Sequence, residues 1–226
     1  PLQPPAWRAK ALEHLGLHYN AYMDKESLQL VEAAMASQDP AVWDMAVLVG
    51  ARLAQAYSWE HTAGERYKKV TAMVDQALAL PRKTAQLNAV LAVGLLGLKD
   101  RVAQMEKLAL DAKEDAEVRL AALKALAPIA RPASIEAVEA CAKSGDAKLA
   151  AAAEEVRPFV LVAQLAGSDA TQKAKAYEAL YAQGLRALNA LTPHLLSQEA
   201  TEAQAMARTI LGDALLKGQL LPEIDR

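Results

Sequence analysis

Apolar and polar positions follow a helical spacing from one end of the chain to the other. Apolar residues recur three and four positions apart, and only short polar or proline-containing stretches interrupt them. Because no interruption is long, neighbouring helices are expected to form antiparallel hairpins. The pattern predicts helices over residues 6–21, 25–37, 40–57, 62–79, 83–97, 99–112, 116–130, 133–144, 147–157, 158–167, 170–183, 185–196 and 199–217.

The starts of several predicted helices carry recognisable local signals. An aspartate at the N-cap accepts hydrogen bonds from the first free backbone N–H groups of a helix. Four aspartates stand at such positions: Asp39, Asp115, Asp146 and Asp169. Proline is poorly tolerated inside a helix, so three prolines are expected to mark junctions. These are Pro81, Pro132 and Pro158.

The helical pattern also repeats. Asp115 and Asp146 open similar units 31 residues apart, and residues 85–91 match residues 117–123 at an offset of 32. Self-similarity at this period is typical of stacked helical repeats. Val118, Ala122 and Leu126 fall on one apolar stripe that its own helix cannot bury, so each pair of helices must pack on its neighbours.

The run Asp-x-Glu-Val-Arg-x-Ala-Ala-x-x-Ala-Leu at residues 115–126 resembles the first helix of a HEAT-like repeat, in particular the short type found in phycobilisome-lyase proteins. The opening at residues 39–46 is similar. The resemblance implies an all-α solenoid of about six antiparallel helix pairs, forming a single domain over residues 1–226. The chain opens on Pro1 without an initiating methionine, which is expected of a processed chain or of a piece of a longer one.

Composition agrees with an all-α fold and places limits on partners. Hydrophobic residues make up 53% of the 226 residues, yet the mean hydropathy is only +0.03 because much of the apolar content is alanine, a strong helix former. The net charge is −2, so no global field attracts nucleic acid or an anionic membrane. The uncharged run 84–98 is too short to span a bilayer. We expect a soluble protein, with the cytoplasm favoured and a processed or exported form left open.

Catalytic and metal-binding signatures are not found in the sequence. It contains no nucleophile elbow, Walker loop, dinucleotide fingerprint or zinc-protease helix. His14 and His18 are spaced to share a helix face, but position 15 is leucine and no third ligand is evident. The single cysteine, Cys141, lies among apolar positions and is predicted to be a small buried residue. We therefore predict no catalytic, cofactor-binding or metal-binding residues, and no cofactor.

Two uneven distributions suggest where a protein partner binds. Most aromatic residues lie in the first third of the chain, where they either fill the core or form an exposed contact site. Residues 61–107 have an excess of basic side chains, which are either solvated helix faces or a ridge for an acidic partner. The candidate contact residues are Trp7, Trp43, Tyr57, Trp59, Tyr67, Arg82, Lys83, Lys99 and Arg101.

These observations favour a non-enzymatic protein-binding scaffold or adaptor, or a subunit of a larger assembly. The alternative is a HEAT-like DNA-repair glycosylase that binds DNA in a concave groove, although a pI of about 6.2 argues against a surface that follows phosphates. A repeat-type lyase or chaperone for a chromophore protein is implied by the family resemblance alone.

Overall fold

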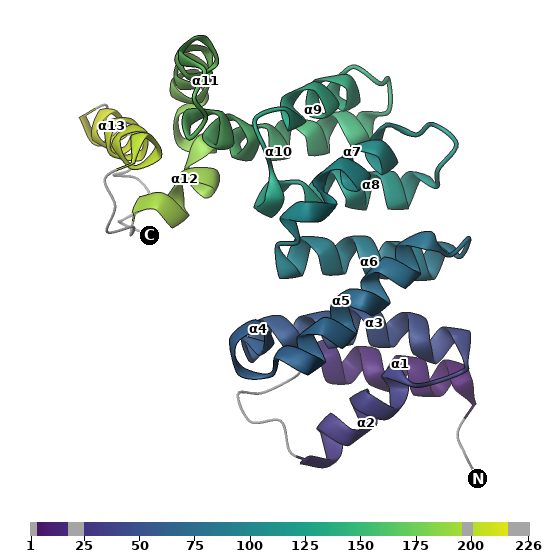
Figure 1. The fold of residues 1–226 in the computed structure, drawn as a ribbon. Coiled ribbons are helices and arrows are strands. Elements are labelled where there is room, and N and C mark those ends of the chain that lie inside the picture. The colour runs from purple at the N-terminus through teal and green to yellow at the C-terminus, as the bar shows by residue number, and fades with distance from the viewer. Residues whose placement is uncertain (1–3, 18–24, 196–200, 217–226) are drawn as a thin grey trace. The chain divides into compact units, whose positions relative to one another are not determined.

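The computed structural model describes residues 4–17, 25–195 and 201–216, and within these ranges it contains helices and no strand (Figure 1). His18, Tyr19 and Tyr22 lie outside the described residues. The α-helices are α1 (Pro5–Leu17), α2 (Lys25–Met35), α3 (Pro40–Ala56), α4 (Trp59–Thr62), α5 (Gly64–Ala79), α6 (Lys83–Leu96), α7 (Val102–Leu110), α8 (Ala116–Ala125), α9 (Ser134–Ala142), α10 (Ala147–Leu165), α11 (Ala170–Gln183), α12 (Leu188–Leu195) and α13 (Glu202–Leu216). Short 3₁₀ helices are η1 (Lys99–Arg101), η2 (Ala127–Ile129) and η3 (Gly184–Ala187).

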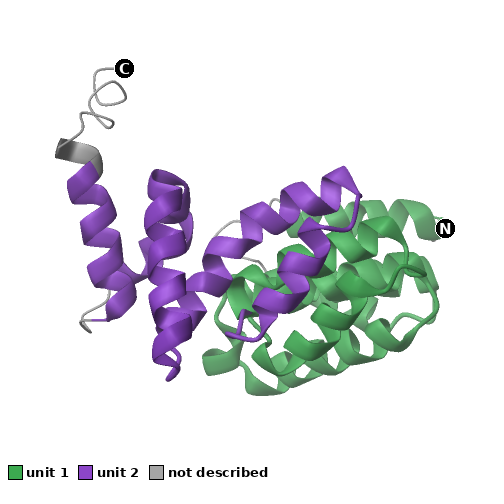
Figure 2. Cartoon of the chain, turned by 90° about the horizontal axis from the view of Figure 1, so that it is seen from above, with its two compact units in different colours: residues 1–129 green, residues 130–226 purple. Residues whose placement is uncertain are grey.

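Contacts divide the chain into two compact units, coloured separately in Figure 2. Unit 1 comprises residues 1–129 and contains α1 to α8. Unit 2 comprises residues 130–226 and contains α9 to α13. The single domain expected over residues 1–226 stays a prediction. None of the helices in the described ranges has the length and apolar content needed to cross a membrane.

Helix α3 is the centre of unit 1. It packs against α1, α2, α5 and α6, and most of its residues are buried. This explains why residues 42–53 are apolar on nearly every side, because neighbours of the same chain cover several faces of the helix. Further along unit 1, α6 packs closely on α8. A side chain at Gly94 would place its Cβ 3.3 Å from Ala125 Cα, so glycine permits this close approach.

All four predicted N-caps are confirmed. The side chains of Asp39, Asp146 and Asp169 each accept from two backbone N–H groups in the first turn of the helix that follows, and Asp115 accepts from the Glu117 N–H. Pro81 and Pro132 also lie between helices, as predicted.

Pro158 does not mark a junction, and the prediction of two separate helices over residues 147–157 and 158–167 is wrong. Helix α10 runs without interruption from Ala147 to Leu165 with Pro158 buried inside it. A proline removes only one backbone hydrogen bond, and here α10 packs against α9, α11 and α12, which hold the helix together. Buried side chains on both sides of the proline, including Val156 and Val160, contribute to this packing.

Smaller boundary shifts have local causes. Ser58 adopts a left-handed conformation with φ 50°, which ends the turn after α3 and lets the short helix α4 form before α5. The helix predicted over 116–130 ends at Ala125 and continues as η2. Leu126, between the two, is completely buried, and so is Cys141 in α9 apart from 1% of its surface. The predicted burial of both residues is confirmed.

Candidate functional site

A hollow of about 380 Å³ in unit 1 brings together two of the predicted contact residues. It lies where the end of α2 and the start of α3 meet the end of α5 and the turn that precedes α6. The lining residues are Met35, Ala36, Ser37, Gln38, Pro40, Trp43, Gln76, Leu80 and Arg82. Trp43 and Arg82, 39 positions apart in the sequence, therefore share one site.

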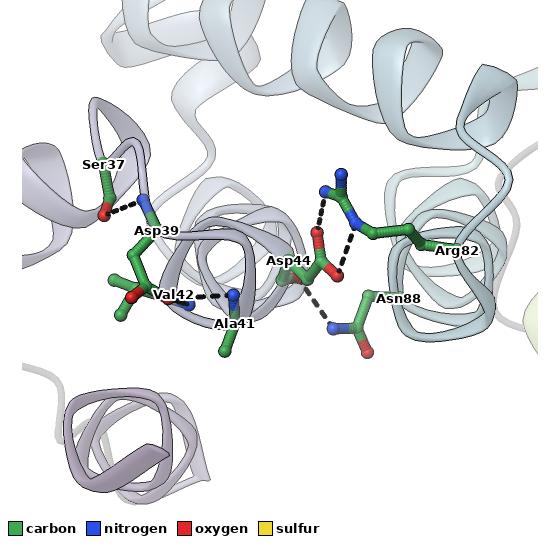
Figure 3. Close-up of polar contacts among 7 residues, drawn as sticks. All are labelled: Ser37, Asp39, Ala41, Val42, Asp44, Arg82 and Asn88. Carbon is green, nitrogen blue, oxygen red and sulfur yellow. Dashed lines mark hydrogen bonds and ion pairs between the residues drawn. The ribbon is translucent and has the colours of Figure 1, made fainter. Parts of the chain in front are cut away.

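The wall of this hollow is held by an ion pair between Arg82 and Asp44 (Figure 3). Arg82 Nη2 donates to Asp44 Oδ1 at 2.5 Å, and Arg82 Nε donates to Asp44 Oδ2 at 3.3 Å. The Asp44 side chain is 5% exposed, whereas the Arg82 side chain is 38% exposed. Asn88 Nδ2 donates to the backbone oxygen of Asp44 at 2.7 Å and ties α6 to α3. The two-point contact fixes the plane of the guanidinium group.

The same ion pair perturbs the arginine. Its hydrogen bonds to Asp44 raise the pKa of Arg82 above its ordinary value, so this group is positively charged at neutral pH. The Arg82 guanidinium also lies over the Trp43 ring, with Cζ 5.9 Å from the ring centroid. This distance is within the range of a cation–π interaction. The hollow thus presents a charged guanidinium positioned over an indole ring.

The rim at the start of α3 is built by the Asp39 cap (Figure 3). Asp39 Oδ1 accepts from the backbone N–H groups of Ala41 and Val42, at 3.0 and 3.2 Å. The Asp39 N–H in turn donates to Ser37 Oγ at 3.1 Å. Because these contacts satisfy the free backbone groups of the helix start, the position of Trp43 one turn later is well defined.

The other aromatic candidates are not gathered at this hollow. Trp7, on α1, is 71% exposed, and Tyr57 and Tyr67 are half-buried. Burial raises the pKa of Tyr67, with further contributions from the charges of Glu60 and Asp100. Trp59 is only 5% exposed and packs in the core with the Arg66 guanidinium over its ring. Trp43, by contrast, is only partly buried.

The basic excess over residues 61–107 is largely neutralised by ion pairs. Arg66 pairs with Glu32, and Lys83 contacts both Asp115 and Glu117. Arg101 donates to Asp75 at 2.6 and 2.7 Å and also contacts Asp100. Lys99 is exposed in η1. The roles in partner binding stay predictions for all nine candidates: Trp7, Trp43, Tyr57, Trp59, Tyr67, Arg82, Lys83, Lys99 and Arg101.

Sequence reasoning missed Asp44 and Asn88. Both are polar residues inside otherwise apolar helical runs, and that exception was the available signal. The lining of the hollow offers donors, acceptors and an aromatic face, which suit binding and orienting a partner group. No cluster of three potential metal-ligating side chains occurs among the described residues.

No protein-family model and no curated protein sequence matches this chain. Among solved structures, the complex of CpcE and CpcF of phycocyanin lyase from Nostoc sp. PCC7120 contains a similar chain, with a TM-score of 0.53 and 15% sequence identity. The similarity covers 94% of this chain and 95% of that one. It confirms the predicted HEAT-like all-α solenoid fold.

The same comparison corrects the expected function. The prediction of a non-enzymatic scaffold, with a DNA-repair glycosylase as the alternative, is contradicted, because the matching structure belongs to a phycocyanin lyase. From the sequence alone, the absence of catalytic motifs counts as evidence against an enzyme. A fold that also occurs in a lyase complex removes the force of that argument.

Proposed function

We propose that this chain is a subunit of a lyase-type complex that acts on a chromophore-bearing protein. The observation that carries the proposal is the end-to-end correspondence with the phycocyanin lyase structure, which spans nearly the whole of both chains. A correspondence of this extent concerns the whole repeat array rather than a few helix pairs that any solenoid would share.

The hollow at Trp43 and Arg82 supports a role in holding substrate. An indole with a fixed guanidinium over its ring suits a group that carries negative charge and an apolar part, because the cation pairs with the charge while the indole supplies apolar contact. The Arg82 side chain keeps free donor capacity on its exposed side, since Asp44 occupies only part of the fork. Such a site positions a reacting group without itself exchanging protons.

A second subunit is part of the proposal, because the similar structure is a complex of two subunits. On this chain, exposed apolar residues on α1 and α2 support a contact there: Trp7, Leu17 and Leu30. An apolar hollow of about 420 Å³ lies between these helices and is lined by Leu12, Leu15 and Leu30, among others. Exposed apolar surface of this kind is typical of protein interfaces.

The proposal is tested by bilin attachment. The purified chain, alone and with any protein that co-purifies with it at a constant ratio, is incubated with a free bilin and an apo-phycocyanin subunit. Covalent product is measured as bilin fluorescence of the phycocyanin band after denaturing electrophoresis. We expect attachment above the spontaneous level, and a reduced rate for Trp43→Ala. Attachment no faster than with the heat-unfolded chain would reject the proposal.

A further inference from the structure

A groove in unit 2 crosses three helices and has no assigned role. Each helix contributes one face, since the lining residues recur three and four positions apart. They are Ile135, Glu139 and Lys143 from α9 and its C-cap, Arg157, Leu161 and Gln164 from α10, and Gln172, Lys175, Ala176 and Ala179 from α11. The groove has a volume of about 420 Å³, which is within the usual range of small-molecule sites, roughly 300–1,000 Å³.

The lining combines an apolar floor with an excess of positive charge. Ile135, Leu161, Ala176 and Ala179 supply apolar surface. The lining also includes three cations, Lys143, Arg157 and Lys175, but only one carboxylate, that of Glu139. Neither Lys143 nor Lys175 forms an ion pair within the part of the chain that the structure describes. This differs from the basic residues of unit 1, most of which are matched by carboxylates.

The third cation of the groove, Arg157, is only partly paired within the protein. Its Nη2 contacts Glu154 at 3.1 Å, but its Nε is buried and has no hydrogen-bond partner in the structure. A buried donor without an acceptor is costly, and such groups are rare in native proteins. The Arg157 side chain is 30% exposed, and a carboxylate in the groove would pair with the accessible part of its guanidinium rather than with the buried Nε.

We infer that this groove binds a small organic carboxylate with an apolar body. The carboxylate lies among Lys143, Arg157 and Lys175, where it accepts from the cations, and the apolar body packs on Ile135 and Leu161. The ligand class follows from the lining, because the cations can pair with a carboxylate while Ile135 and Leu161 offer apolar surface to a hydrocarbon body. This inference is independent of the proposed function.

The test uses naphthalene-2-carboxylate and its neutral isostere naphthalene-2-carboxamide as probes, with binding measured by calorimetric titration. The two probes have the same apolar body and nearly the same shape, so the difference in their affinities reports the charge. We expect the carboxylate to bind about tenfold more tightly, which corresponds to about 1.4 kcal/mol.

The double variant Lys143→Gln/Lys175→Gln should abolish this preference and leave carboxamide binding within about twofold. The matched control, Lys113→Gln/Lys148→Gln, removes the same charge from exposed positions outside the groove and should keep the preference. Absence of binding, equal affinities for the two probes, or an equal loss in the control variant would each overturn the inference. Circular dichroism of each variant verifies that unit 2 remains folded.

Discussion

Replacing either residue of the Asp44–Arg82 ion pair should lower the stability of unit 1, but by unequal amounts. Replacing Arg82 by methionine keeps the apolar stem beside Trp43 but leaves a carboxylate that is only 5% exposed without its cation. Breaking a fully buried pair costs about 3–5 kcal/mol. Because Arg82 is itself 38% exposed and the hollow admits water, the expected cost is below that range, about 2–3 kcal/mol.

Replacing Asp44 by alanine should cost much less. The arginine that remains can turn toward solvent, the Asn88 bond to the Asp44 backbone oxygen persists, and alanine favours the helix by about 0.5 kcal/mol or more. We therefore expect a cost below about 1 kcal/mol for Asp44→Ala. The double variant should be more stable than Arg82→Met alone, since it no longer contains an unpaired buried charge.

Urea unfolding followed by tryptophan fluorescence measures the free energy of unfolding of unit 1 in each variant. Trp7, Trp43 and Trp59 all lie in unit 1, so the signal reports that unit. The reasoning would be refuted if Asp44→Ala destabilised unit 1 as much as Arg82→Met, or if the costs of the two substitutions simply added in the double variant.

Three further predictions concern other parts of the fold. Leu126→Ala should lower the free energy of unfolding by about 2–5 kcal/mol, because the side chain is completely buried. The control Leu110→Ala, at an exposed position, should change it by less than about 0.5 kcal/mol. Equal urea midpoints for the two variants would contradict this prediction. The hydrogen bond from the Glu117 N–H, assisted by Lys83, holds the pKa of Asp115 below its ordinary value. The ionised Asp115 therefore stabilises the fold above its unfolded-state pKa, and this contribution is lost as the pH falls through its folded-state pKa. Thermal melts between about pH 2 and 6 should show a weaker acid dependence for Asp115→Asn than for the unmodified chain. Cys141 should react with a thiol reagent only as fast as the protein opens, and rapid stoichiometric labelling of the folded chain would show that its burial is wrong.

Local signals in the sequence predicted local structure well. The N-caps at Asp39, Asp115, Asp146 and Asp169 depend on a few neighbouring residues, and all four form as predicted. Pro158 shows the limit of such rules. The proline signal is local, but the helix that contains it is maintained by packing against other helices, which the local pattern does not reveal.

The candidate site was only partly predictable for a related reason. Trp43 and Arg82 were both named, but their meeting depends on the packing of α3 against the start of α6. Counting charges in a window also missed the carboxylates that neutralise the basic residues. Asp44 lies 38 positions before Arg82, and Glu32 lies 34 positions before Arg66. Long-range pairing of this kind is a property of the fold.

The most direct test of the proposed lyase function is whether each molecule of the chain supports the attachment of many bilins. Bilin attachment is followed with the chain, together with any stably co-purifying subunit, at about one-hundredth of the concentration of apo-phycocyanin. A catalytic subunit should yield many attached bilins per molecule of chain, with an initial rate proportional to its concentration. Product that stops at one bilin per chain, or that forms at the spontaneous rate, would contradict the assignment to a lyase-type complex.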